Sequence, residues 1–497
     1  MNSVARFDER ALGWSGMAAV ITAGACIANA FAYALLAANP LIQSDIWRYL
    51  DGFLGTYIER GFSLSVLFAR ADMNDANMPL HKLVLFLHTS LFDMDFLCEA
   101  AIAMLCCVVC VLSLVRLAAN RGIGNWRNRE YWLLSGLCLV LLSLNSTQIY
   151  SWPRATMWYV PILVSFVYFR IMKEARVVQV VALTFFLGVL LLEFALPVVA
   201  AMLGALWASR LATPRRLGAI AIAAATGLLA AAMFYWSFEW SIGGVDVAMS
   251  KPRSFAAFAD AGVWQMLVLP LADSMVHESN VHALFGRFLP LASVLPWLLL
   301  VAHAWFWWRV FMRRKDINPD SSAATYAAVA VMLFFYGLLV GIMVQRVPEF
   351  GFKYLHQPRY VLFYQLNLAA LLVLAYRETA GVSWTWRSRA GIAMAIALSC
   401  ALQLRLSELA WAHLQYASRY YEQAALDMGR VAQAPTTDIE CVPVVTVCKF
   451  PEKRRERIMR MLASHRLNLF SPAFQARHRL YPDGRSPLAL AADPAVP

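Results

Sequence analysis

Long apolar runs recur along most of this 497-residue chain, and they limit what it can fold into. The hydrocarbon core of a bilayer is about 30 Å thick, so a helix needs about 20 apolar residues to cross it. Runs of this kind lie at 13–39, 96–118, 131–149, 156–170, 216–236, 286–308, 324–344, 359–376 and 389–406. With 60% hydrophobic and only 15% charged residues, a soluble core could not hide this much apolar surface. The sequence therefore predicts an all-α integral membrane protein.

One further apolar run, 177–208, is too long for a single upright span and is interrupted by Glu193 and Pro197. We interpret it as a hairpin of two short spans with Glu193 at its tip, which brings the total to about 11 spans. An ionisable side chain within apolar sequence is costly to bury, so Glu193 is also a candidate functional residue.

The distribution of Lys and Arg predicts the orientation, because these residues accumulate in short cytoplasmic loops. The basic loops all fall on one side only if 177–208 is a hairpin. That side is the cytoplasm and includes the N-terminus, which predicts a multi-pass membrane protein whose C-terminal tail lies outside the cytoplasm. The net charge of +12 resides largely in these loops, so nucleic acid is not an expected partner.

The expected organisation is a membrane domain, 1–406, followed by a C-terminal periplasmic domain, 407–497. The first periplasmic loop, 40–95, and a second one, 237–285, are both long. We expect an interfacial helix near 254–273 in the second loop and an amphipathic helix at 452–465 in the tail.

Two of the nine cysteines stand apart from the others. Most of the rest lie inside apolar runs, whereas Cys441 and Cys448 lie in the polar tail, in the stretch CVPVVTVC. Their spacing would let them close a small disulfide loop, which favours an oxidising compartment. A pair of free thiols is the alternative.

The first loop carries carboxylates just beyond the first span. In SDIWRYLDG, residues 44–52, Asp45 and Asp51 each lie three residues from Arg48, within reach on a helix. One interpretation is structural: Ser44 caps a helix and Asp45 favours its dipole. The other is a general base whose basicity is raised by partial desolvation at the membrane surface. Asp75 follows in a polar turn, NDANMP, and is a third candidate.

The second outer loop contains HESNVH, residues 277–282. A zinc-protease motif needs two histidines four residues apart on one helical face, and here they are five apart. We therefore do not expect a zinc protease, but His277, Glu278 and His282 are candidates for lining a polar cleft. No metal or other cofactor is implied elsewhere.

A basic cluster lies on the outer side, against the positive-inside trend. The stretch QRVPEFGFKYLHQPRY, residues 345–360, carries Arg346, Lys353, His356 and Arg359. Such a cluster is explained either by anchoring to lipid headgroups or by an anionic partner, and a phosphate is the obvious candidate.

Taken together, these features resemble the GT-C superfamily of polytopic membrane glycosyltransferases. The resemblance rests on the predicted spans, the long first outer loop with Asp45 and Asp51, the paired hairpins and an outer C-terminal domain. NDANMP and the pair Arg359-Tyr360 opening a late span also look like motifs of bacterial members. The chain departs from the pattern in having no tight Asp-Asp pair.

The resemblance implies an inverting transferase that uses a polyprenyl-phosphate-linked sugar and an acceptor of the cell envelope, which is a glycan, a lipid or a protein. An Asp of the first loop would be the base, and Asp45 lies closest to the expected position. Two other classes stay open: a transporter or flippase of a lipid-linked or anionic precursor, and a membrane enzyme of the O-antigen polymerase or acyltransferase type.

Overall fold

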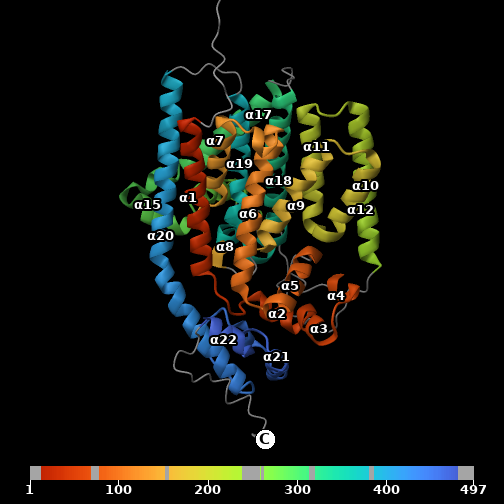
Figure 1. Cartoon of the computed structure of the whole chain (residues 1–497), viewed down its shortest axis with the longest axis vertical. Helices are drawn as coiled ribbons and strands as arrows, with labels where there is room; N and C mark the ends of the chain where they lie inside the picture. Colours follow the sequence, from red (N-terminus) through yellow and green to blue (C-terminus); the bar gives the residue numbers. More distant parts are fainter. Residues whose placement is uncertain are drawn as a thin grey trace, which may run out of the picture.

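The computed structural model describes residues 13–68, 78–151, 156–237, 258, 262–312, 319–379 and 386–478. Within these ranges every regular element is a helix, so the predicted all-α class is confirmed. Most of the helices run roughly parallel or antiparallel in one bundle, and shorter helices gather at one end of it (Figure 1).

Six of the helices are long and apolar enough to cross a membrane. They belong to α1 (Trp14–Ala37), α6 (Phe96–Ala119), α12 (Pro214–Trp236), α17 (Leu295–Met312), α18 (Pro319–Phe350) and α19 (Val361–Glu378). The described residues are thus those of a helical membrane protein with several spans, whereas the predicted 11 spans are not confirmed.

Of the five other predicted spans, 389–406 lies within α20 (Trp386–Gln433), and four correspond to shorter apolar helices. These are α7 (Asn128–Leu141), α9 (Thr156–Met172), α10 (Val177–Leu191) and α11 (Ala195–Ser209). At 1.5 Å per residue, a 15-residue helix is about 22 Å long and falls short of a 30 Å hydrocarbon core. The predicted hairpin at 177–208 is nevertheless present, because the 3-10 turn Leu192–Phe194 joins α10 to α11.

Close packing at glycine positions holds this hairpin to its neighbours. A Cβ at Gly227 of α12 would lie only 2.7 Å from the carbonyl oxygen of Val181 on α10. On α18, a Cβ at Gly337 would lie 2.7 Å from the Cβ of Pro197 on α11. Small residues at such positions let helices approach closely, which is how helices associate where lipid supplies no hydrophobic driving force.

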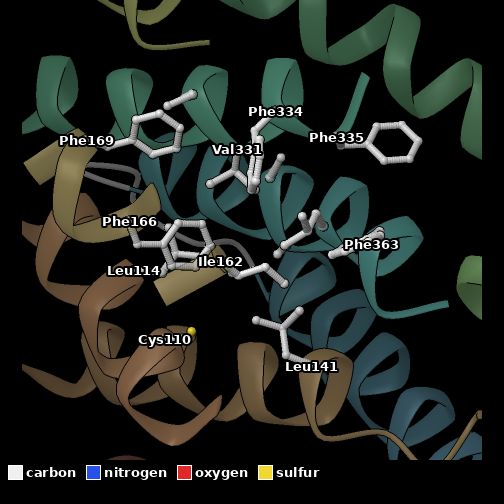
Figure 2. Close-up of a cluster of buried hydrophobic side chains, with 14 of the residues drawn as sticks. Cys110, Leu114, Leu141, Ile162, Phe166, Phe169, Val331, Phe334, Phe335 and Phe363 are labelled. Atoms are coloured by element: carbon white, nitrogen blue, oxygen red, sulfur yellow. The ribbon is translucent and has the colours of Figure 1, made fainter. Parts of the chain in front are cut away.

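The centre of the bundle is a continuous apolar core. Figure 2 shows part of it, with Phe169 of α9 lying near Phe334 of α18. Their ring centroids are 6.1 Å apart in an edge-to-face arrangement, a geometry favoured by aromatic quadrupoles. On the opposite, outward face of α12, Ile222, Leu229 and Met233 are exposed, as expected of side chains that contact lipid.

The short helices at one end form a second unit, which we call the outer unit. The first loop contributes α2 (Asp45–Asp51), α3 (Phe53–Arg60), α4 (Leu64–Phe68) and α5 (Pro79–Phe92), and the tail contributes α21 (Glu452–Ser464) and α22 (Pro472–His478). These segments share one buried apolar cluster that includes Trp47, Phe53, Ile458 and Leu462. Segments more than 350 residues apart in the chain thus pack together.

Backbone hydrogen bonds reinforce this packing. The Ser44 amide donates to the Val444 carbonyl over 2.8 Å, and the Asn468 amide donates to the Asp93 carbonyl over 2.8 Å. Cys441 and Cys448 form a disulfide in the connecting segment. The tail is therefore folded onto the first loop instead of standing alone.

Two of the expected outer helices have counterparts. The amphipathic helix predicted at 452–465 is α21, which buries Ile458 and Leu462 and exposes its charged face. The interfacial helix expected near 254–273 corresponds in part to α14 (Gly262–Met275). Most of the first half of the expected range lies outside the described residues. The last long helix, α20 (Trp386–Gln433), continues without a break past residue 406, where we expected the membrane domain to end.

Candidate functional site

The carboxylates of the first loop lie in the outer unit. Asp45 is the first residue of α2 and is partly buried, and Arg48 is exposed. Ser44 precedes the helix as expected, but its side chain makes no capping hydrogen bond, so that part of the structural interpretation was wrong. Its backbone has a positive φ of 46° and is held by the tail, since Thr446 donates to the Ser44 carbonyl over 2.9 Å.

Asp51 ends the same helix and is bound by the tail. Arg457 donates to a carboxylate oxygen of Asp51 over 2.5 Å, and Arg454 lies 3.6 Å from the other oxygen. These ion pairs link α2 to α21, which gives Asp51 a structural partner in this arrangement. Asp75 lies outside the described residues.

Glu193 lies in the 3-10 turn between α10 and α11, where the hairpin interpretation placed it, and its side chain is outside the described part. The next residue, Phe194, packs against Phe363 of α19, with ring centroids 5.9 Å apart. Phe363 also packs edge-to-face against Trp158, and Trp158 against Tyr360. The hairpin tip is therefore linked by aromatic contacts to the start of α19.

The predicted basic cluster occupies the connection between α18 and α19. Gly351 has a φ of 77°, which lets the chain turn sharply after α18. Two 3-10 turns follow, Phe352–His356 and Pro358–Tyr360, and they lead directly into α19. The sequence RVPEFGFKYLHQPRY thus folds back on itself and brings its basic residues to one end of two helices.

The arginine at this connection is embedded among aromatic rings. Arg359 donates to the Tyr354 hydroxyl, and its guanidinium lies 5.5 Å from the ring centroids of Tyr354 and Tyr360. Arg346, from the end of α18, acts electrostatically on the Tyr360 phenol as well. No carboxylate of the described part of the chain pairs with Arg346, Lys353 or Arg359.

Beside these residues lies a polar network that the sequence did not reveal. His356 donates from Nδ1 to the Asp273 carboxylate of α14 over 2.8 Å. The other carboxylate oxygen of Asp273 accepts the Glu278 amide over 3.1 Å. The Asp273 side chain is 2% exposed and that of His356 is 19% exposed. A buried carboxylate thus orients a partly accessible imidazole.

The same network includes two of the HESNVH residues. His277 caps α15 (Glu278–Phe285), accepting the Ser279 amide at Nδ1 over 3.3 Å, and donates from Nε2 to the His356 carbonyl over 2.8 Å. The Glu278 carboxylate lies 3.5 Å from Nδ1 of His356. His282 is exposed at the last turn of α15. His277 therefore has a structural role, and Glu278 is close to the imidazole.

Asn145 ties this network to the loop after α7. Its side-chain amide donates to the Asp273 carbonyl over 2.8 Å, and its side-chain oxygen accepts the His277 amide over 2.7 Å. Asn145 is 1% exposed. Nothing in the local sequence marked it, because its partners are 128 and 132 residues away.

The surroundings change the protonation of His356. The hydrogen bond to Asp273 raises the pKa of His356 above its ordinary value, burial opposes this, and the negative charges of Asp273 and Glu278 add to the increase. The pKa of His356 therefore lies above the ordinary value of about 6.5 for a histidine in water.

Further polar side chains are buried near the start of α6. Glu99 is fully buried and accepts hydrogen bonds from the amide and hydroxyl of Thr156 at the start of α9. In α5, Lys82 is 3% exposed, and burial lowers its pKa to about 7. A charged residue in the first turn of an apolar run is a signal that could have singled out Glu99 from the sequence.

A second polar network lies within the candidate spans. Tyr336 of α18 donates to His303 of α17 over 2.9 Å and accepts from Trp307 over 3.1 Å. Asn367 of α19 lies 3.4 Å from the other ring nitrogen of His303. Polar residues are thus not confined to the outer loops.

The described residues contain no group of three or more His, Cys, Asp or Glu side chains arranged to hold a metal ion. Comparisons with protein-family models, with curated proteins and with solved structures find no match to this chain. The site is therefore interpreted from its own chemistry.

Proposed function

We propose that this protein is a membrane glycosyltransferase that moves a sugar from a polyprenyl-phosphate donor to an acceptor of the cell envelope. In this proposal the N-terminus is cytoplasmic, and the outer unit and the α18–α19 connection face the periplasm of a bacterial inner membrane. The short helices α7, α9, α10 and α11 complete the proposed set of 11 spans together with the first part of α20.

The observation that carries the proposal is the basic cluster at the α18–α19 connection. Arg346, Lys353 and Arg359 have no carboxylate partner among the described residues. Arg359 is instead held by Tyr354. A partly buried arginine usually pairs with an anion, since desolvating an uncompensated charge is costly. A guanidinium also suits the oxygens of a phosphate. A lipid-linked sugar phosphate supplies such an anion at the membrane surface.

The proposed chemistry needs two functions at this surface. The cations stabilise the phosphate that leaves when the sugar is transferred. A basic group takes the proton of the attacking hydroxyl. The resemblance to GT-C enzymes points to Asp45 for the second function, with Asp51 and Asp75 as rivals, and Asp51 is already paired with Arg457.

The direct test is an assay of the purified protein with labelled polyprenyl-phosphate sugars. We expect transfer by the wild type and a loss of about 100-fold or more in Arg359→Ala, the range found for removing one oxyanion donor. Arg460→Ala is the matched control, because Arg460 is 77% exposed on α21 and pairs with Glu456. No transfer by the wild type from any donor, or equal activity of both variants, would contradict the proposal.

Transport of a lipid-linked precursor is the second candidate, and the His303–Tyr336–Asn367 network favours it. Ionisable groups inside spans often mark proton or substrate pathways. His303→Asn should impair translocation of a labelled donor in proteoliposomes if the protein is a transporter. The same variant should leave sugar transfer unchanged if the protein is a transferase.

A further inference from the structure

The Asp273–His356 pair joins a buried carboxylate to a partly accessible imidazole through a hydrogen bond. His356 is three residues before Arg359, on the connection that carries the basic cluster. Because Nδ1 carries the proton donated to Asp273, the neutral imidazole presents its lone pair at Nε2. The structure gives Nε2 no hydrogen-bond partner among the described residues. Nε2 is thus a hydrogen-bond acceptor on the same connection that carries the basic cluster.

We infer that His356, oriented by Asp273, is the base that takes the proton of the acceptor hydroxyl in the proposed glycosyl transfer. This inference rests on the proposed function, and it assigns to His356 the part that the resemblance gives to Asp45. It identifies Asp273 as a positioning residue and His356 as a catalytic residue.

Sugar transfer with His356 as the base is a displacement at the anomeric carbon of the donor. The acceptor oxygen forms a bond to the anomeric carbon of the sugar, and its proton moves to Nε2 of His356. The bond from the anomeric carbon to the phosphate oxygen breaks, and its electron pair leaves with the polyprenyl phosphate. Arg346 and Arg359 stabilise the added negative charge. The imidazolium then returns its proton to solvent, and its charge is stabilised meanwhile by Asp273.

The arrangement around Asp273 supports a positioning role. The carboxylate is fixed on one side by the Glu278 amide, and its helix is held by Asn145. An aspartate locked in this way selects one tautomer of its histidine and stabilises the protonated form, as in serine hydrolases. The charged or titratable groups around His356 and on the segments next to it are Asp273, His277, Glu278, Arg346, Glu349, Lys353, Tyr354, Arg359, Tyr360 and Tyr364.

If His356 had only a structural role, a variant that keeps its hydrogen bond to Asp273 would keep the transfer activity. A conservative substitution therefore separates a structural role from a catalytic one. In His356→Asn the side-chain amide can still donate to Asp273 but offers no base at the position of Nε2. We expect transfer to fall about 100-fold to 10,000-fold in this variant, the range of general-base catalysis, while donor binding is kept. His465→Asn, at an exposed histidine outside this site, should stay within about threefold of the wild type.

The pH profile tests the positioning residue. In the wild type, the rate of transfer should rise with pH as His356 loses its proton. Asp273→Asn should shift this rise to lower pH by about one unit or more, because no neighbouring anion then favours the imidazolium. An unchanged profile in Asp273→Asn, or wild-type transfer by His356→Asn, would overturn the inference while leaving the proposed function standing.

A binding measurement separates failure of the inference from failure of the proposed function. Undecaprenyl phosphate should protect His356 from carbethoxylation by diethyl pyrocarbonate, detected by peptide mass spectrometry, whereas undecaprenol should not. The exposed His282 and His465 are internal controls whose labelling should not change. Protection should vanish in Arg359→Ala. If the wild type neither binds undecaprenyl phosphate nor transfers sugar, both proposals fail; if it binds and transfers without protecting His356, only the inference fails.

Discussion

Asn468 links the docked tail to both ends of the first loop through its side chain. It is fully buried, and its side-chain amide donates to the Pro40 carbonyl over 2.9 Å and to the Met94 carbonyl over 2.7 Å. Its backbone φ is 49°, in the left-handed region that costs most residues roughly 1–2 kcal/mol. Asparagine tolerates this conformation and supplies both hydrogen bonds.

Two substitutions separate the two contributions at this position. Each lost hydrogen bond is worth about 1 kcal/mol, so Asn468→Gly should weaken docking by about 2 kcal/mol. Asn468→Ala loses the same bonds and adds the left-handed strain, for about 3–4 kcal/mol in total. Since 1.4 kcal/mol corresponds to a factor of ten, opening of the tail should increase about 30-fold with Gly and about 100-fold to 1,000-fold with Ala.

Hydrogen exchange of the tail peptide around 465–478, followed by mass spectrometry in detergent micelles, measures this opening. Arg466 is the matched control, because it is exposed and also has a left-handed φ, 52°. Arg466→Gly should leave docking intact or strengthen it. If the Ala and Gly variants of Asn468 exchange at the same rate, or if both exchange like the wild type, the reasoning is refuted.

Three further outcomes are expected. Replacing Cys441 and Cys448 with Ser should destabilise the outer unit by about 2.5 kcal/mol on loop-entropy grounds, measured as a lower melting temperature that a reductant reproduces in the wild type. Lys82→Met should raise the melting temperature below pH 7, because burial lowers the pKa of Lys82 to about 7 and the charged form is costly to bury. This gain in melting temperature should shrink as the pH rises from 7 toward 10. A gain that does not depend on pH would contradict the prediction. Gly227→Ala should destabilise the protein by about 1–3 kcal/mol through overpacking, whereas Gly218→Ala in the same helix, with nothing within 4 Å, should be neutral or stabilising.

The sequence by itself determined the helical membrane class and the hairpin at 177–208. Both follow from local physics: apolar runs must pair their backbone groups internally in lipid, and Glu193 with Pro197 interrupts a run too long for one span. The sequence also predicted the amphipathic helix at 452–465 and the basic stretch between α18 and α19, because both patterns depend only on residues close together in the chain.

Only the tertiary structure decided which distant groups meet. Asp51, which the sequence offered as a base, is paired with Arg457, 406 residues away. Asp273 appeared as an ordinary residue of an outer helix until the fold placed it against His356, 83 residues further on. Contacts over such separations depend on how the helices pack, since a local pattern specifies the face a residue occupies but not the side chain across from it.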